Sequence, residues 1–226
     1  MSRPRRSRWL PLLPAVAAVT SLGLAVKPAL IDNVAPHNFG VVEEGKVYRA
    51  GQLTPAAFDA LHRKYRFKTI VDLGSYEPNS VGDRRNQRLA DALGLARFRF
   101  DLAGDATGNP NWYVYALRLM ADPQRQPVLV HCGAGSERTG CVVILYNKLV
   151  HGATIEDGLK ASRDFGHDER RNPRLAEVLA AHGDAILNAV CDGPATLVSG
   201  VPPIPPPAVC SCDRDSHPDR SALGAP

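Results

Sequence analysis

Short apolar runs alternate with longer amphipathic stretches along the chain from residue 38 onward. Four of the runs have the length and composition of strands. They read KVYRAGQ at 46–52, KTIVDLG at 68–74, ARFRFDL at 96–102 and QPVLV at 126–130. Because strands that alternate with helices form parallel sheets covered on both faces, the pattern predicts an α/β fold with a central, mostly parallel sheet flanked by helices.

Helix start signals lie between and after these strands. Threonine or asparagine stands at each expected cap position, and in three cases proline follows at the first helical position. The signals are Thr54 with Pro55, Asn109 with Pro110, Thr154, and Asn172 with Pro173. A further helix is predicted over about 84–93, and the last helix is predicted to end near Val190. Residues 31–190 are therefore expected to form one domain.

The two ends of the chain differ in composition from this domain. Four arginines within the first eight residues precede an uncharged run of 18 residues at 9–26, which as a hydrophobic helix would nearly cross a bilayer core. Residues 1–30 are therefore predicted to be a signal or a membrane anchor, with cleavage left open. Since arginines favour the cytoplasmic side, the domain is expected to be membrane-anchored or exported and to lie on the non-cytoplasmic side. The proline-rich residues 191–226 are predicted to be a disordered tail.

The charge and the cysteines of the chain exclude two kinds of site. The formal net charge is +4, but four of the 27 basic residues are the N-terminal arginines, so the other basic residues balance the 23 acidic ones. A nucleic-acid surface needs a clustered basic face, so no nucleic-acid partner is expected. The five cysteines contain no C-x-x-C pair and have no histidine cluster beside them, so no metal site is predicted.

The stretch PVLVHCGAGSERTG at 127–140 carries the clearest chemical signal. It places Cys132 at the C-terminal end of a buried strand and leads through a glycine-rich turn into a helix. Backbone N–H groups converge in such a turn and the helix dipole adds positive potential, so the turn suits an oxyanion and favours a nucleophilic thiolate over a thiol. Arg138 can hold two phosphoryl oxygens with its planar guanidinium, and Gly133 and Gly135 let the backbone approach the anion closely.

The segment HCGAGSERTG resembles the signature of the cysteine-dependent protein tyrosine phosphatases, His-Cys-x-x-Gly-x-x-Arg-Ser/Thr-Gly, at every specified position. The stretch NFGVVEEGKVYRAGQLTPAAFDALHRKYRFKTIVDLG at 38–74 looks like the N-terminal half of the small, atypical dual-specificity-like phosphatases. The resemblance covers about residues 38–182. It implies a tyrosine-phosphatase-like fold and a phosphatase that needs neither a cofactor nor a metal.

The resemblance also implies roles for individual residues. Cys132 would attack phosphorus to form a cysteinyl-phosphate, Thr139 would hydrogen-bond the sulfur, and His131 would orient the loop from behind. The phosphoryl oxygens would be cradled by the side chain of Arg138 and by the backbone amides of Gly133, Ala134, Gly135, Ser136, Glu137 and Arg138.

The family's general acid is an aspartate on a mobile loop after the preceding strand. Asp105 and Asp101 are both candidates in this chain. Asp105 is preferred because glycines and a proline give it the surroundings of a movable loop, whereas Asp101 ends the strand. These hinge-like neighbours are Gly104, Gly108 and Pro110.

One position departs from the pattern of the relatives. In them an arginine follows the strand TIVDL, whereas Gly74 stands there in this chain, and Arg84 and Arg85 are the candidates to replace it. Other residues near the motif have a plain structural interpretation. These are Cys141 as an inert buried thiol, Trp112, Tyr113 and Tyr115 as packing residues, His167 and Asp168 as solvated loop residues, and Tyr48 and Arg49 as either a substrate rim or part of the first strand.

Together these features predict a phosphatase that hydrolyses phosphomonoesters, of the phosphotyrosine or dual-specificity type. The variable loop positions carry no lysine, and the acidic Glu137 beside Arg138 disfavours a polyanionic substrate. The alternatives are a phosphatase of phosphoinositides or small phosphorylated metabolites, a rhodanese-like sulfurtransferase, and a phospho-binding module. The expected partners are a phosphorylated protein or a small phosphoester, and a membrane through the N-terminal segment.

Overall fold

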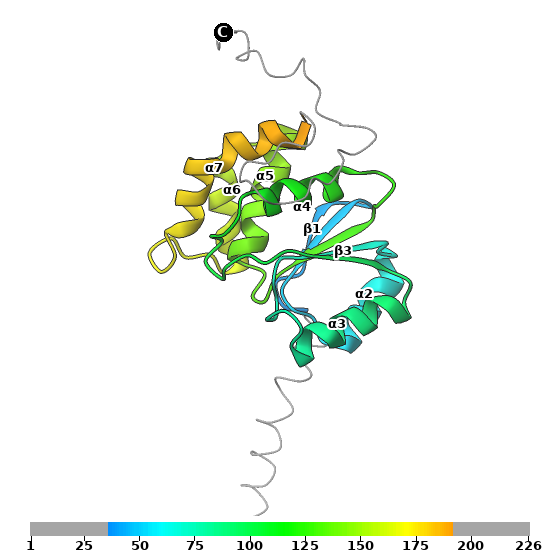
Figure 1. Ribbon diagram of the computed structural model, residues 1–226. Helices are drawn as coiled ribbons and strands as arrows, with labels where there is room; N and C mark the ends of the chain where they lie inside the picture. The colour runs from blue at the N-terminus through cyan, green and yellow to red at the C-terminus, as the bar shows by residue number, and fades with distance from the viewer. Residues whose placement is uncertain (1–35, 192–226) are drawn as a thin grey trace, which may run out of the picture.

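The computed structural model describes residues 36–191, which place a five-stranded sheet between two groups of helices (Figure 1). The strand order is β1-β2-β5-β3-β4; the β1–β2 pair is antiparallel and the other three pairs are parallel. The predicted mostly parallel sheet is thus confirmed, and an unpredicted edge strand makes it mixed. The strands are β1 (Gly40–Glu43), β2 (Val47–Ala50), β3 (Thr69–Asp72), β4 (Ala96–Arg99) and β5 (Val128–His131).

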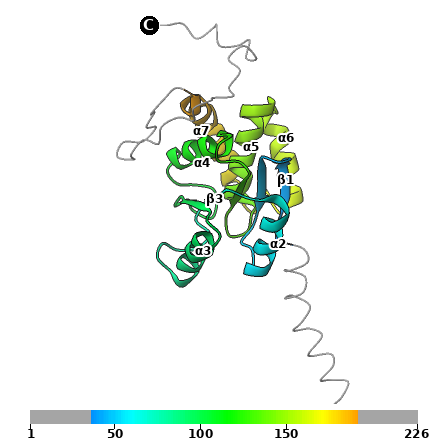
Figure 2. The same ribbon diagram turned by 90° about the vertical axis from the view of Figure 1, so that its right-hand side faces the viewer.

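Helices cover both faces of the sheet, as predicted (Figures 1 and 2). Side chains alternate between the faces along β5: Val128 and Val130 join the core under α4, α5 and α7, whereas Leu129 joins the core under α2 and α3. The helices are α2 (Pro55–Tyr65), α3 (Val81–Ala92), α4 (Asn111–Ala121), α5 (Glu137–His151), α6 (Ile155–Ser162), the 3-10 turn η1 (Arg163–Phe165) and α7 (Arg174–Cys191).

Two of the predicted helix caps are confirmed. The hydroxyl of Thr54 accepts a hydrogen bond from Ala57 N (3.2 Å), and that of Thr154 accepts one from Asp157 N (3.0 Å). Asn109 and Asn172 instead accept from the amides two residues onward, at 3.0 and 3.2 Å, and thus form the turn before each helix. The helix predicted from about residue 84 begins at Val81, because Ser80 caps it.

The carboxyl ends of β2, β5, β3 and β4 lie along one edge of the sheet, because these strands are parallel neighbours. The loops that follow them meet at this edge, where open α/β sheets place their ligand sites. β5 lies between β2 and β3, and the neighbouring loops hold its end in place. Gln52 N donates to Gly133 O (2.7 Å) and Leu73 N donates to His131 O (2.8 Å). The loop after β5 is therefore anchored on both sides.

The predicted signal or anchor segment and almost all of the predicted tail lie outside the described residues. Within residues 36–191, no helix is both long enough and apolar enough to span a bilayer. The same part of the chain contains no cluster of three or more histidine, cysteine or acidic side chains able to hold a metal ion. Helix α7 ends at Cys191, next to the predicted boundary at residue 190.

Candidate active site

Cys132 directly follows β5 and is buried, with an exposed fraction of 2%. Gly135 N donates a hydrogen bond to its Sγ at 3.2 Å, so the turn folds back over the sulfur. Gly135 has a φ of +77°, and a Cβ there would lie 2.5 Å from Gly51 N and 2.7 Å from Ala50 C. Only glycine fits this position, because the turn is packed directly against the end of β2.

The carbonyl groups of the turn point away from its interior. Because the C=O and N–H of a trans peptide point in opposite directions, the amides of the next residues face inward and form a nest for an anion. The carbonyls of Gly133, Ala134 and Gly135 accept hydrogen bonds from Gln52 N (2.7 Å), Asn38 Nδ2 (2.8 Å) and Arg49 Nη2 (2.5 Å) respectively.

Arg138 lies in the first turn of α5, and its guanidinium reaches the same interior. Its Nη1 donates to Leu73 O (3.1 Å), to Leu102 O (3.2 Å) and to Gly74 O. Its Nη2 lies 3.4 Å from the position that a Cβ on Gly133 would occupy. The guanidinium therefore bridges the loops after β3 and β4 directly beside the loop that carries Cys132.

The side chains of Ser136 and Glu137 turn away from the nest. Ser136 Oγ donates to Phe165 O (2.7 Å), and the Glu137 carboxylate lies 2.8 Å from Nδ1 of His167. His167 is only 5% exposed, so its prediction as a solvated loop residue was wrong, whereas Asp168 is exposed as predicted. Thr139 is fully buried with its hydroxyl free of hydrogen bonds to the described residues, so its role toward sulfur stays a prediction.

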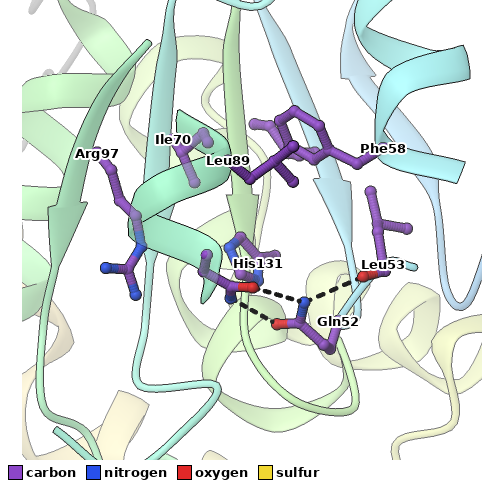
Figure 3. A pocket seen from close by; sticks show the side chains of 9 residues that line it. Gln52, Leu53, Phe58, Ile70, Leu89, Arg97 and His131 are labelled. Carbon is purple, nitrogen blue, oxygen red and sulfur yellow. Dashed lines mark hydrogen bonds between the residues drawn. The ribbon is translucent and has the colours of Figure 1, made fainter. Parts of the chain in front are cut away.

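His131 lies behind the nest, on the α2–α3 side of the sheet (Figure 3). Its Nε2 is 3.8 Å from the carboxylate of Asp72, which also accepts hydrogen bonds from the backbone N–H of Gly74 (3.1 Å) and Ser75 (2.9 Å). Burial alone would raise the pKa of Asp72, but His131, Ser75 and Arg97 together hold that pKa well below its usual range. The ionised Asp72 thus fixes the loop after β3 against which Arg138 rests.

A cleft of about 550 Å³ opens in front of Arg138. Asp101 lines it, and its side chain is 65% exposed and 3.3 Å from Arg99 Nη2. Asp105 is not among the lining residues; its carboxylate accepts from Thr107 Oγ1 (2.6 Å) and Thr107 N (3.1 Å), which lowers its pKa. The remaining lining residues are Gly74, Ser75, Tyr76, Glu77, Leu102, Ala103, Gly104 and Gly108.

A family model described as the tyrosine phosphatase family matches residues 33–155. The chain belongs to this family. Its membership argues against the rhodanese-like alternative.

Similar sequences come from fungi and plants. Inositol diphosphatase SIW14 of Saccharomyces cerevisiae is 28% identical over 120 residues, which are 51% of this chain and 41% of the relative. Inositol diphosphatase DSP2 of Oryza sativa subsp. japonica is 34% identical over 140 residues, 60% of this chain and 65% of the relative. OCA1 of Yarrowia lipolytica, whose name assigns it provisionally to the tyrosine-protein phosphatases, is 36% identical over 125 residues, 52% of this chain and 46% of the relative. The chain spans about half the length of the curated relatives it matches.

Solved structures share the fold of this tyrosine phosphatase family member. The catalytic domain of SIW14 from S. cerevisiae, solved with citrate, superposes with a TM-score of 0.51 at 24% identity, covering 63% of this chain and 92% of that one. TpbA of P. aeruginosa gives a TM-score of 0.54 at 20% identity, covering 68% and 90%. PTPMT1 gives 0.53 at 16% identity, covering 66% and 96%.

In this family member a side chain at Gly74, two residues after β3, would crowd Arg138. Gly74 has a φ of +81°, and a Cβ there would lie 3.2 Å from Arg138 Nη1. Arg84 and Arg85 were the candidates to replace the arginine that the relatives carry at this position. Neither of them lines the cleft. Arg85 reaches its edge indirectly, since its Nη2 donates to Tyr76 Oη at 3.0 Å, whereas Arg84 bonds to Asn79 O.

Sequence reasoning missed most of the residues that support the phosphatase loop from outside. Arg49 was predicted for the strand or a substrate rim; it is 4% exposed and lies behind the loop, so the rim role is wrong. Tyr113 and Tyr115 are buried packing residues as predicted, and Tyr113 Oη also donates to Ala106 O (2.8 Å) in the loop of Asp105. The residues that support the loop and were not predicted to do so are Asn38, Phe165 and His167. No motif near residues 131–140 predicts their contacts with it.

Proposed function

We propose that this protein hydrolyses phosphomonoesters through a cysteinyl-phosphate intermediate. The observation that carries the proposal is the nest of inward-facing amides that surrounds Cys132 Sγ, with the Arg138 guanidinium beside it. In the first step the thiolate forms a bond to phosphorus while the ester oxygen leaves and takes a proton from the general acid. In the second step water attacks phosphorus and gives its proton to the same carboxylate, which releases phosphate and restores the thiolate.

We propose phosphotyrosine or a related protein phosphoester as the substrate class. Glu137 does not support this choice, because its carboxylate contacts His167 and points away from the nest. The support comes from the cleft, whose lining contains the carboxylates Glu77 and Asp101 and a single basic side chain, Arg138. Such a lining favours a substrate with one phosphoryl group over one that carries many.

A small, highly phosphorylated metabolite is the second candidate. SIW14 and DSP2 are named inositol diphosphatases, and this chain matches part of each. In addition, Arg85 and Arg88 of α3 line a second depression, and Arg85 contacts Tyr76 at the cleft wall. These cations could hold phosphates distant from the one that is cleaved.

We propose Asp105 as the general acid, brought to the substrate by movement of loop 102–109. Its carboxylate bonds to Thr107 within the same loop, so it can move together with the loop. A Cβ on Gly104 would meet nothing within 4 Å, which places the start of the loop in open space. Asp101, which already lines the cleft, is the alternative.

We also propose that the catalytic domain is exported or membrane-anchored and lies on the non-cytoplasmic side. The support is the arrangement of arginines and apolar residues at 1–26. A topology reporter fused after the last residue checks this: activity of a reporter that works only in the cytoplasm would contradict the proposal.

The test of the proposed reaction is hydrolysis of p-nitrophenyl phosphate by the purified protein in the presence of a metal chelator. Turnover is expected without added metal and should vanish in Cys132→Ser, which keeps the shape of the nest but lacks the thiolate. Activity that requires metal, or that survives in Cys132→Ser, contradicts the mechanism. Phosphate binding that persists without any turnover by the wild type would instead favour the phospho-binding module.

A matched substrate panel then separates the two substrate classes. Phosphotyrosine peptides, phosphoinositides and inositol pyrophosphates are compared by kcat/KM at one ionic strength. A higher value for the peptides is expected. A preference for inositol pyrophosphates that is lost in Arg85→Gln together with Arg88→Gln would establish the second candidate.

A further inference from the structure

Arg49 is a buried cation whose contacts do not include a carboxylate. Its side chain extends from β2 to the back of the phosphate-binding turn and is 4% exposed. Within residues 36–191, no aspartate or glutamate forms an ion pair with it, and its Nε has no hydrogen-bond partner. A buried charge without a counter-charge is strongly unfavourable. The position therefore requires an explanation beyond packing.

The guanidinium of Arg49 is held between the turn and an aromatic ring. Its Nη2 donates to Gly135 O at 2.5 Å, and its Cζ lies 3.6 Å from the centre of the Phe165 ring. Phe165 is itself fixed, because its carbonyl accepts from Ser136 Oγ (2.7 Å) and from Asn38 Nδ2 (2.9 Å). The Phe165 ring excludes water from one face of the guanidinium, and the hydrogen bond to Gly135 O directs the guanidinium at the turn.

Gly135 connects Arg49 to Cys132: its N–H donates to Cys132 Sγ at 3.2 Å, and its carbonyl accepts from Arg49 Nη2 at 2.5 Å. Burial lowers the pKa of Arg49 to about 10, and the negative charge of Cys132 opposes this change by raising it. At neutral pH the guanidinium is therefore still protonated and attracts a negative sulfur. Attraction between charges in a poorly solvated site is much stronger than in water.

We propose that Arg49 is a positioning residue that serves as the buried counter-charge of the Cys132 thiolate. It acts from behind the turn, through the Gly135 carbonyl, and orients that peptide so that the amide of Ser136 faces the anion. Arg138 acts on the opposite side, where the phosphoryl group binds. The site thus has two cations with different tasks: one stabilises the nucleophile before substrate arrives, and the other binds the group that is transferred.

The other titratable groups around Cys132 already have partners or carry no charge at neutral pH. Arg138 is bonded to three carbonyls, and His131 lies near Asp72. Burial raises the pKa of Cys141 to about 12, and burial together with the nearby thiols raises the pKa of Tyr113 well above its ordinary value. Arg138 lies on the side where the phosphoryl group would bind and His131 faces Asp72, so Arg49 is the cation that lies behind the turn.

The test measures how fast iodoacetamide alkylates Cys132 in the full chain between pH 4 and 9, with mass spectrometry to identify the modified residue. Arg49→Gln keeps a donor for Gly135 O but removes the charge, whereas Arg49→Lys keeps the charge. The midpoint of the rate profile is expected to rise by about one pH unit or more in Arg49→Gln. In Arg49→Lys the midpoint should stay close to the wild-type value, because the charge is kept. Equal midpoints in the wild type and Arg49→Gln would overturn the proposal.

Two further variants keep the test decisive if Arg49→Gln folds poorly. Phe165→Leu retains Arg49 but admits water beside it, so the midpoint should rise in the same direction by a smaller amount; an unchanged midpoint contradicts the proposal. Arg118→Gln is the matched control, because Arg118 is 2% exposed and donates to the carbonyls of Ala189 and Val190. It should lower the melting temperature and leave the midpoint unchanged. The alkylation profile is independent of the substrate, so it separates this inference from the proposed function.

Discussion

Ser136 and Glu137 belong by sequence to the predicted phosphate-binding turn, but their side chains point away from its interior. The side chain of Ser136 bonds to Phe165 O, and that of Glu137 pairs with His167. A motif gives the order of residues but not the direction of each side chain. The acidic side chains that bear on substrate charge are therefore Glu77 and Asp101, which line the cleft, and not Glu137.

The glycine at position 135 can be tested against a glycine in a similar conformation. In Gly135→Ala the Cβ would lie 2.5 Å from Gly51 N, so the turn must shift and kcat/KM should fall by roughly 100-fold. Gly152 also has a positive φ of +66°, but a Cβ there would meet nothing within 4 Å. Gly152→Ala should therefore cost about 1 kcal/mol of stability and leave kcat/KM unchanged. Equal kinetic losses in the two variants would show that the close packing at residue 135 is unimportant.

The general acid is identified by comparing two leaving groups. Asp105→Asn should lower kcat by about 100-fold or more for phenyl phosphate, and by less for p-nitrophenyl phosphate, whose product needs little protonation. Asp101→Asn should change both rates by less than about tenfold, because Asp101 lies in the exposed part of the cleft. If Asp101→Asn shows the leaving-group dependence and Asp105→Asn does not, the roles are exchanged.

At the scale of elements, a buried ionic cluster joins β3, β4 and α3 beneath the cleft. Arg97 of β4 lies 2.7 Å from the carboxylate of Asp72 at the end of β3 and 2.5 Å from that of Asp83 in the first turn of α3. Asp72 also caps the loop on which Arg138 rests. The cluster therefore connects the packing of α3 to the position of Arg138.

This cluster makes the stability of the protein dependent on pH. The pKa of Asp72 is lower in the folded state than in the unfolded chain, despite its burial, because His131, Ser75 and Arg97 favour the carboxylate. Protonation therefore favours unfolding, and the stabilisation present above about pH 4 is lost as the pH falls further. The free energy of unfolding should decrease from about pH 5 to pH 2 when measured by urea denaturation.

Two substitutions assign that decrease to the cluster. Asp72→Asn should lower the free energy of unfolding at pH 7 and reduce its dependence on acid pH, because position 72 then carries no carboxylate to be protonated, whereas Asp83 keeps its ion pair with Arg97. Asp59→Asn serves as the control, since its ion pair with Arg63 lies on the surface of α2. If Asp72→Asn keeps the full acid dependence, other carboxylates are responsible.

Most elements follow from local sequence, and the exceptions have physical causes. The strands 47–50, 69–72 and 96–99 lie within predicted runs that are bounded by turns, and 128–131 extends one residue beyond its predicted run at 126–130. β1 was missed because Gly40–Glu43 lacks a buried run and is defined by its pairing with β2. In the site, Cys132 and Arg138 lie where the motif predicts, whereas Asn38, Arg49 and Phe165 reach the turn from distant segments that local patterns do not relate.

At the scale of the whole molecule, α7 completes the larger of the two cores. Ile186, Leu187 and Val190 are buried there, and Arg118 of α4 donates to the carbonyls of Ala189 and Val190. The resemblance recognised in the sequence extends only to about residue 182. The last two turns of α7 therefore belong to the folded domain although they lie beyond the recognisable part of the chain.

A pair of shortened chains tests this role of α7. A chain that ends at residue 183 loses the large buried side chains of Ile186, Leu187 and Val190, each of which stabilises the fold by about 1.5–3 kcal/mol. This loss is comparable with the whole stability of a typical domain, about 5–15 kcal/mol, so the shortened chain should be largely unfolded at 25 °C. A chain that ends at residue 191 should melt cooperatively by circular dichroism. Similar melting of both chains would contradict the assigned role.

The position of β5 in the sheet has a consequence for biosynthesis. β2 and β3 are both made before β5, yet each pairs with it along its inner edge, since Val128 lies opposite both Val47 and Thr69. A nascent chain that stops short of residue 128 therefore has two strands with unpaired edges, which invite misassembly until the ribosome has delivered the central strand. Cys132 emerges four residues after Val128. The sulfur of Cys132 thus leaves the ribosome only as the sheet that shelters it is closing.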